Sequence, residues 1–123
     1  MAEGTRLDLI AAADVGQAAA AALLDPARFH GREIALAAES LTMDEVADAI
    51  ARVTGKAVGV RHLSAERAVE GGNRPALVES QQWASVEGYK VHPAESAALG
   101  IRLEPFADWA MRQRDRFEIG PQA

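Results

Sequence analysis

The sequence contains no cysteine, only six aromatic residues and few large apolar side chains. Without cysteine the chain can form no disulfide, no thiolate metal site and no cysteine nucleophile. Of the 60 residues in the hydrophobic class, 27 are alanine, which leaves 33 larger apolar side chains to fill a core. The length of 123 residues predicts that residues 1–123 form a single domain or a fragment of a larger one.

Long runs of basic or apolar residues are also missing. The 13 basic and 18 acidic residues give a formal charge of −5, and without a basic run we expect no nucleic-acid partner. Asp8, Asp14 and Gln17 interrupt the apolar stretches near the N-terminus, so neither a signal peptide nor a membrane span is expected. These absences together predict a cytoplasmic protein.

Three apolar stretches have the length of strands, and they cover residues 7–13, 32–38 and 57–63. The first leads into an alanine-rich helix from about Val15 to Leu24, with Asp14 as the predicted N-cap. After the second stretch, Thr42-Met43-Asp44-Glu45 has the pattern of a capping box, and Gly55 should end the helix that follows. We therefore predict an α/β fold in which residues 7–63 form a βαβαβ segment.

From Ser64 onward the pattern is helical and less regular. Ser64 is predicted to cap a short helix, and prolines at 75, 93 and 105 are predicted to begin three more. Residues 64–123 should therefore be mainly helical.

Several short motifs occur here in an order that is more specific than any one of them. They are Ala13-Asp14-Val15-Gly16, Ala21-Ala22-Leu23-Leu24-Asp25-Pro26, Gly31-Arg32-Glu33-Ile34, Leu41-Thr42-Met43-Asp44-Glu45-Val46, Thr54-Gly55-Lys56, Gly88-Tyr89-Lys90 and Pro105-Phe106-Ala107-Asp108-Trp109. In this order the chain resembles the C-terminal part of NmrA-like proteins, a branch of the atypical and extended short-chain dehydrogenase/reductases in the NAD(P)-binding Rossmann superfamily. The resemblance implies a βαβα segment from the C-terminal part of a Rossmann-type fold, followed by a mostly helical substrate-side region. An intact relative would use NADP or NAD.

The motifs that carry chemistry in such proteins are not found in these 123 residues. No Gly-x-Gly-x-x-Gly or Gly-x-x-Gly-x-x-Gly occurs, so we expect no cofactor-binding residue in this chain and no measurable binding of NAD or NADP by the chain alone. The superfamily's catalytic tyrosine has a lysine four positions later. The single tyrosine, Tyr89, has Lys90 beside it and Ala94 at that position. We therefore assign no catalytic residue.

Two aromatic residues are the candidates for a substrate pocket. Trp83 and Tyr89 lie in the segment that helps to enclose the substrate in the resembled enzymes, and amphipathic aromatic side chains suit a pocket wall. Trp109, at helical spacing from Phe106, is predicted to lie in the core instead. The three histidines lie about 30 residues apart and have no metal-ligand spacing, so no metal site is expected.

Two functions remain open at this stage. In the first, the chain is the substrate-side portion of an NAD(P)-binding reductase, isomerase or redox-sensing regulator; it lacks the nucleotide-binding half and is inactive alone. In the second, it is a stand-alone interaction module that associates with itself or with a separate Rossmann half. In both cases we predict exposed apolar surface, with residues 32–38 and Leu36 at the association surface.

Overall fold

The computed structural model describes residues 1–120. Its elements, in chain order, are β1 (Arg6–Leu9), α1 (Ala12–Leu24), α2 (Pro26–Phe29), β2 (Glu39–Thr42), α3 (Met43–Thr54), α4 (Ala65–Glu70), α5 (Pro75–Val86), α6 (Pro93–Ala98), α7 (Phe106–Arg112) and the 3₁₀ turn η1 (Arg114–Arg116). The fold is mixed α/β, as the sequence predicts at the level of class.

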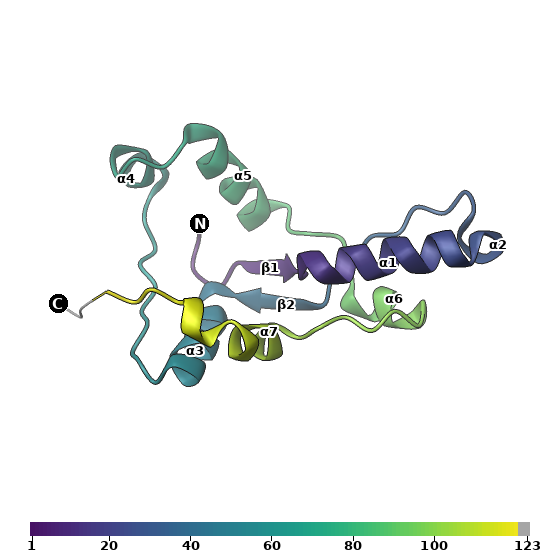
Figure 1. Cartoon of the computed structure of the whole chain (residues 1–123). Helices are drawn as coiled ribbons and strands as arrows, with labels where there is room; N and C mark the ends of the chain where they lie inside the picture. The colour runs from purple at the N-terminus through teal and green to yellow at the C-terminus, as the bar shows by residue number, and fades with distance from the viewer. Residues whose placement is uncertain (121–123) are drawn as a thin grey trace.

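A two-stranded antiparallel sheet lies at the centre of the molecule (Figure 1). Strand β1 pairs with β2 from Arg6 opposite Thr42 to Leu9 opposite Glu39. The Ala38 N–H extends the pairing by donating to the Leu9 carbonyl at 2.8 Å. The predicted strand over 7–13 is therefore too long, because the helix already begins at Ala12.

The predicted strands over 32–38 and 57–63 are wrong, because neither segment is part of a sheet in the described chain. A strand needs a neighbour for its backbone groups, and in segment 32–38 the side chain of Ser96 takes that place. The Ala37 N–H donates to the Ser96 hydroxyl oxygen at 3.2 Å, and this hydroxyl donates to the Ala35 carbonyl at 3.4 Å. The βαβαβ arrangement of residues 7–63 is consequently not formed.

Helix α3 begins and ends where its sequence predicts. The Thr42 hydroxyl accepts the Glu45 N–H at 3.2 Å, and the Glu45 carboxylate accepts the Thr42 N–H at 2.8 Å, which completes the capping box. Gly55 ends the helix in the left-handed region with φ of 70°, where glycine has no steric cost. The helix packs against α7 below the sheet (Figure 1).

The second half of the described chain is helical, as predicted. Ser64 caps α4 by accepting the Arg67 N–H, and proline occupies the first turn of α5 and of α6. Pro105 is the N-cap of α7, which ends at Arg112 and is followed by η1. Of the predicted helical segment 64–123, residues 121–123 lie outside the described part.

The core of the described chain is small. Its buried apolar residues are Ala18, Phe29, Ala37, Ala47, Ala49, Ala68, Val78, Ala84 and Ala110. The accessible surface is 8747 Å², whereas a compact monomer of 13.1 kDa exposes about 6,400 Å². The chain thus exposes roughly 2,000 Å² more than such a monomer. Among the described helices, none has both the length and the apolar character needed to cross a membrane.

Candidate functional site

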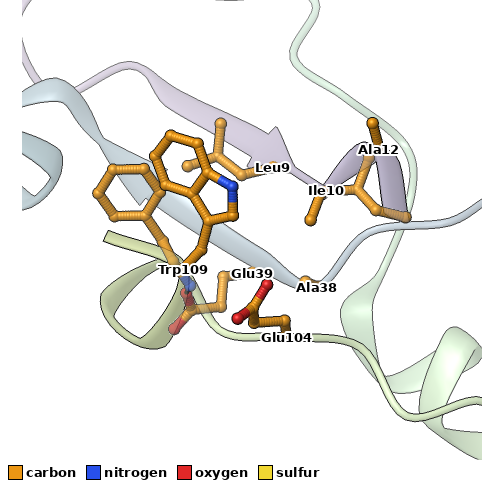
Figure 2. Close-up of a pocket in the computed structure, with 9 residues that line it drawn as sticks. Leu9, Ile10, Ala12, Ala38, Glu39, Glu104 and Trp109 are labelled. Atoms are coloured by element: carbon orange, nitrogen blue, oxygen red, sulfur yellow. Dashed lines mark hydrogen bonds between the residues drawn. The ribbon is translucent and has the colours of Figure 1, made fainter. Parts of the chain in front are cut away.

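A cavity of about 280 Å³ lies where β1 ends and α1 begins (Figure 2). We call it the Trp109 cavity, and its lining residues are Leu9, Ile10, Ala11, Ala12, Ala38, Glu39, Glu104, Phe106 and Trp109. Three segments that are distant in sequence therefore meet there: the end of β1, the start of β2 and the first turn of α7. Most of the wall is apolar, and the polar groups of its side chains are two carboxylates and one indole N–H.

Helix α7 supplies the aromatic wall of the Trp109 cavity. Phe106 and Trp109 are three positions apart and hence on one side of the helix, with ring centroids 5.6 Å apart. Phe117 meets the Trp109 ring edge-on at 6.1 Å. The predicted packing of Trp109 on Phe106 is therefore present, but Trp109 is only half-buried and also lines the cavity. The spacing of these two residues in the sequence does not indicate this second role.

Two carboxylates from the first half of the chain bind the backbone N–H groups of Glu104 and Phe106, which belong to the C-terminal part of the lining of the Trp109 cavity. Asp14 in α1 accepts the Glu104 N–H through Oδ2 at 2.6 Å, and Glu39 in β2 accepts the Phe106 N–H through Oε2 at 2.6 Å. Asp14 is 5% exposed. The prediction that Asp14 is the N-cap of α1 is wrong, because Ala11 occupies that position and the Asp14 side chain is turned to a distant backbone amide instead.

The second carboxylate of the cavity, Glu104, is already paired. Arg112 donates to its two oxygens at 3.1 and 2.5 Å. These hydrogen bonds, with the charge of Arg112, hold the pKa of Glu104 below its usual value and raise the pKa of Arg112. Glu104 is therefore ionised and neutralised by its partner near pH 7. Glu39 keeps one oxygen, Oε1, without a hydrogen-bond partner among residues 1–120.

The two residues predicted from sequence to line a substrate pocket are in contact with each other, away from the Trp109 cavity. The rings of Trp83 and Tyr89 meet edge-on with centroids 5.8 Å apart, and the two residues are 51% and 43% exposed. Tyr89 lines a different cavity of about 460 Å³ between β1 and residues 84–93, which we call the Asp8 cavity. Trp83 does not line it.

The residues present do not fit the pyrophosphate of a dinucleotide. Such a site needs a glycine-rich turn between a strand and the N-terminus of a helix. The junction from β1 to α1 is Ile10-Ala11, and the buried carboxylate of Asp14 lies in the first turn of that helix. A negative charge at this position would repel phosphate. The described glycines with positive φ all lie elsewhere in the chain.

The histidines do not come together in the structure. Nε2 of His62 lies 3.4 Å from Oδ2 of Asp44, so this histidine has a carboxylate partner on α3. His92 lines the Asp8 cavity. Within residues 1–120, no group of three or more histidine, aspartate or glutamate side chains is arranged to hold a metal ion.

Comparison with known protein families gives a match. The sequence matches the NmrA-like family over residues 1–100, a range that contains the sheet, α1 to α6 and the whole of the Asp8 cavity. The aromatic wall of the Trp109 cavity follows that range. No curated protein matches the chain. The NmrA-like family is part of the NAD(P)-binding Rossmann-type superfamily, and because the match covers most of its length, this chain belongs to the NmrA-like family.

Proposed function

We propose that this chain forms the small-molecule side of an NAD(P)-binding protein, with the dinucleotide held by residues outside these 123. Membership of the NmrA-like family supports the first part of the proposal. The second part rests on the misfit described above, since the turn from β1 to α1 has no glycine and has a buried carboxylate beside it. The whole protein would be a reductase, an isomerase or a redox-sensing regulator. This half would contribute binding rather than catalysis.

The Trp109 cavity is the observation that carries this proposal. It lies beyond the carboxyl end of β1, and its lining comes from β1, β2 and α7. Its apolar walls and few polar groups are typical of small-molecule sites. None of the described residues accepts a hydrogen bond from the Trp109 indole N–H, and the nitrogen edge of this ring is turned toward Ile10 (Figure 2). The cavity therefore suits an apolar ring with one hydrogen-bond acceptor.

Acetophenone, a neutral ring with a single carbonyl, is a suitable probe. We expect it to shift the indole ¹H–¹⁵N resonance of Trp109 in the Trp83→Phe variant, in which Trp109 is the only indole. Adding Ala38→Leu should abolish the shift, because the larger side chain fills the cavity. The control is Ala107→Leu, the same change at an exposed position of α7. An unchanged indole resonance, or equal binding by the Ala38→Leu and Ala107→Leu variants, would contradict the proposal.

A second candidate function, association through this chain, has its own supporting observation. The surplus of roughly 2,000 Å² of exposed surface is as large as one partner's share of an obligate interface, which is about 1,000–2,500 Å². The proposed partner is a second copy or a separate Rossmann half. Sedimentation of the isolated chain distinguishes the cases. A dimer would favour self-association, while a monomer that binds ANS would indicate that the natural cover is missing. A monomer without an ANS signal would exclude both.

A further inference from the structure

The Asp8 cavity contains a polar group that the fold leaves without a partner. Asp8 lies in the middle of β1, opposite Ser40 of β2, and it lines the cavity. Its Oδ2 is buried and has no hydrogen-bond partner among the described residues. A buried carboxylate oxygen without a donor costs free energy. In a native structure such a group is satisfied by a donor from outside the chain, either water or a ligand.

Two more side chains around the same cavity are unpaired. Tyr89 and His92 line it, and neither the Tyr89 hydroxyl nor the His92 imidazole has a hydrogen-bond or ion-pair partner within residues 1–120. In contrast, the hydroxyl oxygen of Ser85, also in the lining, accepts from the Thr5 hydroxyl at 3.0 Å and donates to the Gln81 carbonyl at 2.9 Å. The lining therefore contains both paired polar side chains and unpaired ones, and the unpaired ones are available to a ligand.

The charge that faces this cavity is negative. Its charged lining residues are Arg6, Asp8 and Glu87, with His92 as a further titratable group. The Arg6 guanidinium is already engaged, because it donates to the Ser40 carbonyl at 2.5 Å and lies 3.1 Å from the Glu45 carboxylate. The carboxylates of Asp8 and Glu87 have no such cationic partner among the described residues. A cation with N–H donors would satisfy the Asp8 oxygen and balance the charge.

We propose that the Asp8 cavity is a second ligand site and that it takes a small molecule ending in a protonated amine. The ammonium group donates to the Asp8 carboxylate, and the apolar body of the ligand lies against the ring of Tyr89. Tyr89 presents the apolar surface, and its ring is in edge-to-face contact with Trp83, which is not in the lining. This site has a different lining from the Trp109 cavity, so the proposal of an amine ligand does not depend on the function proposed above.

Benzylamine at pH 7 is the probe for this site, and benzyl alcohol is its uncharged counterpart of the same shape. We expect benzylamine to shift the backbone amide resonances of Asp8, Ser40 and Tyr89 in the full chain. The Asp8→Asn variant should bind it at least about tenfold more weakly, because the asparagine oxygen can still accept a hydrogen bond but carries no negative charge to attract the ammonium group. Binding of benzyl alcohol should be weak and unchanged by the substitution.

Asp44→Asn is the matched control, because it removes one negative charge from the exposed surface of α3, outside the cavity. It should leave benzylamine binding unchanged. The Asp8→Asn variant should unfold at an equal or higher urea concentration, since it removes an unpaired buried charge. If that variant does not fold, Tyr89→Leu at a 43% exposed position tests the same site and should also weaken binding. Equal affinity for amine and alcohol, or equal binding by Asp8→Asn and Asp44→Asn, would overturn the proposal.

Discussion

Helices α1 and α3 each follow a strand of the same sheet, but they are stabilised by different means. Residues next to its own ends stabilise α3, through a capping box at Thr42 and a left-handed glycine at Gly55. Helix α1 has no side-chain cap at Ala11, and it continues in the direction of β1 away from the sheet (Figure 1). Only Asp14 and Ala18 are buried along its length. The comparison indicates that α3 is stabilised at its own ends, whereas α1 depends on a distant contact and leaves most of its surface exposed.

The largest expected effect concerns the far end of α1. Leu23 and Leu24 are 82% and 86% exposed, and burying a leucine contributes about 1.5–3 kcal/mol. If α1 is the association surface, Leu23→Ser with Leu24→Ser should weaken self-association by about a hundredfold or more. Sedimentation velocity over a concentration series measures this effect. Asp48→Ser on the exposed side of α3 is the control and should leave association unchanged.

A further variant tests where the association surface lies. Segment 32–38 is not a strand, and Leu36 within it is half-buried. Leu36→Lys should therefore leave association nearly unchanged if the leucines of α1 carry it. If Leu36→Lys abolished self-association and the double serine variant did not weaken it, the association surface would lie in segment 32–38, as the sequence predicts.

The next largest effect is expected from loss of the hydrogen bond between Asp14 of α1 and the Glu104 N–H. Asp14→Ala removes the acceptor of the Glu104 N–H, and a hydrogen bond to a charged group contributes about 1.5–3 kcal/mol. We expect the free energy of unfolding to fall by about 2 kcal/mol, as measured by urea denaturation. Asp14→Asn keeps an acceptor oxygen and should lose less. If the two variants are equally stable, the hydrogen bond to Glu104 is not what makes Asp14 important.

A smaller effect is expected at the start of α3. Thr42→Ala removes the cap and should lower the free energy of unfolding by about 1 kcal/mol. Thr42→Ser keeps the hydroxyl and is the matched control. The urea midpoint reports both variants. A Thr42→Ala protein as stable as the serine variant would show that α3 does not depend on its own cap, and the contrast with α1 would then disappear.

The smallest expected effect is the pH dependence of the pair Glu104–Arg112. Because the pKa of Glu104 is lowered in the folded state, its contribution is fully present above the unfolded value of about 4.5. It is lost as the pH falls through the lower, folded pKa. Arg112→Gln should therefore reduce stability at pH 7 but make no difference in strong acid. A difference between the two proteins that is constant down to strong acid would assign the effect to the Arg112 stem rather than its charge.

The comparison also explains which parts of the structure could be predicted from sequence. The helices that begin at Met43, Pro75 and Pro93 have their signals within a few residues, because the backbone hydrogen bonds of a helix are local. Whether residues 32–38 and 57–63 form strands cannot be decided from local signals, because a strand forms only beside a partner strand that supplies its hydrogen bonds. The Ser96 hydroxyl that bonds Ala37 is 59 positions away in sequence, and no local pattern indicates it.

The candidate sites could be predicted only in part for the same reason. As rare amphipathic aromatics, Trp83 and Tyr89 are the pocket residues that the sequence predicts, and Tyr89 does line a cavity. Their role in binding stays a prediction. The Trp109 cavity could not be expected, because its walls come from three segments that are distant in sequence. The local position of Asp14 predicts a helix cap, whereas its actual partner is 90 positions away. The unpaired oxygen of Asp8 also has no signal in the sequence. It is unpaired because no hydrogen-bond donor of the described chain lies within reach in the folded structure.

The two carboxylates that hold the aromatic wall set the order in which the molecule can assemble. Asp14 and Glu104 are 90 residues apart, and Glu39 and Phe106 are 67 apart. Closing loops of this length costs conformational entropy before the contacts contribute any favourable free energy. We therefore expect these contacts to form late in folding. During synthesis, α3 can form with its own caps while the chain is still growing. The Trp109 cavity comes into existence only after α7 has left the ribosome, because Phe106 and Trp109 form part of its wall, whereas every residue of the Asp8 cavity has been synthesised before that point.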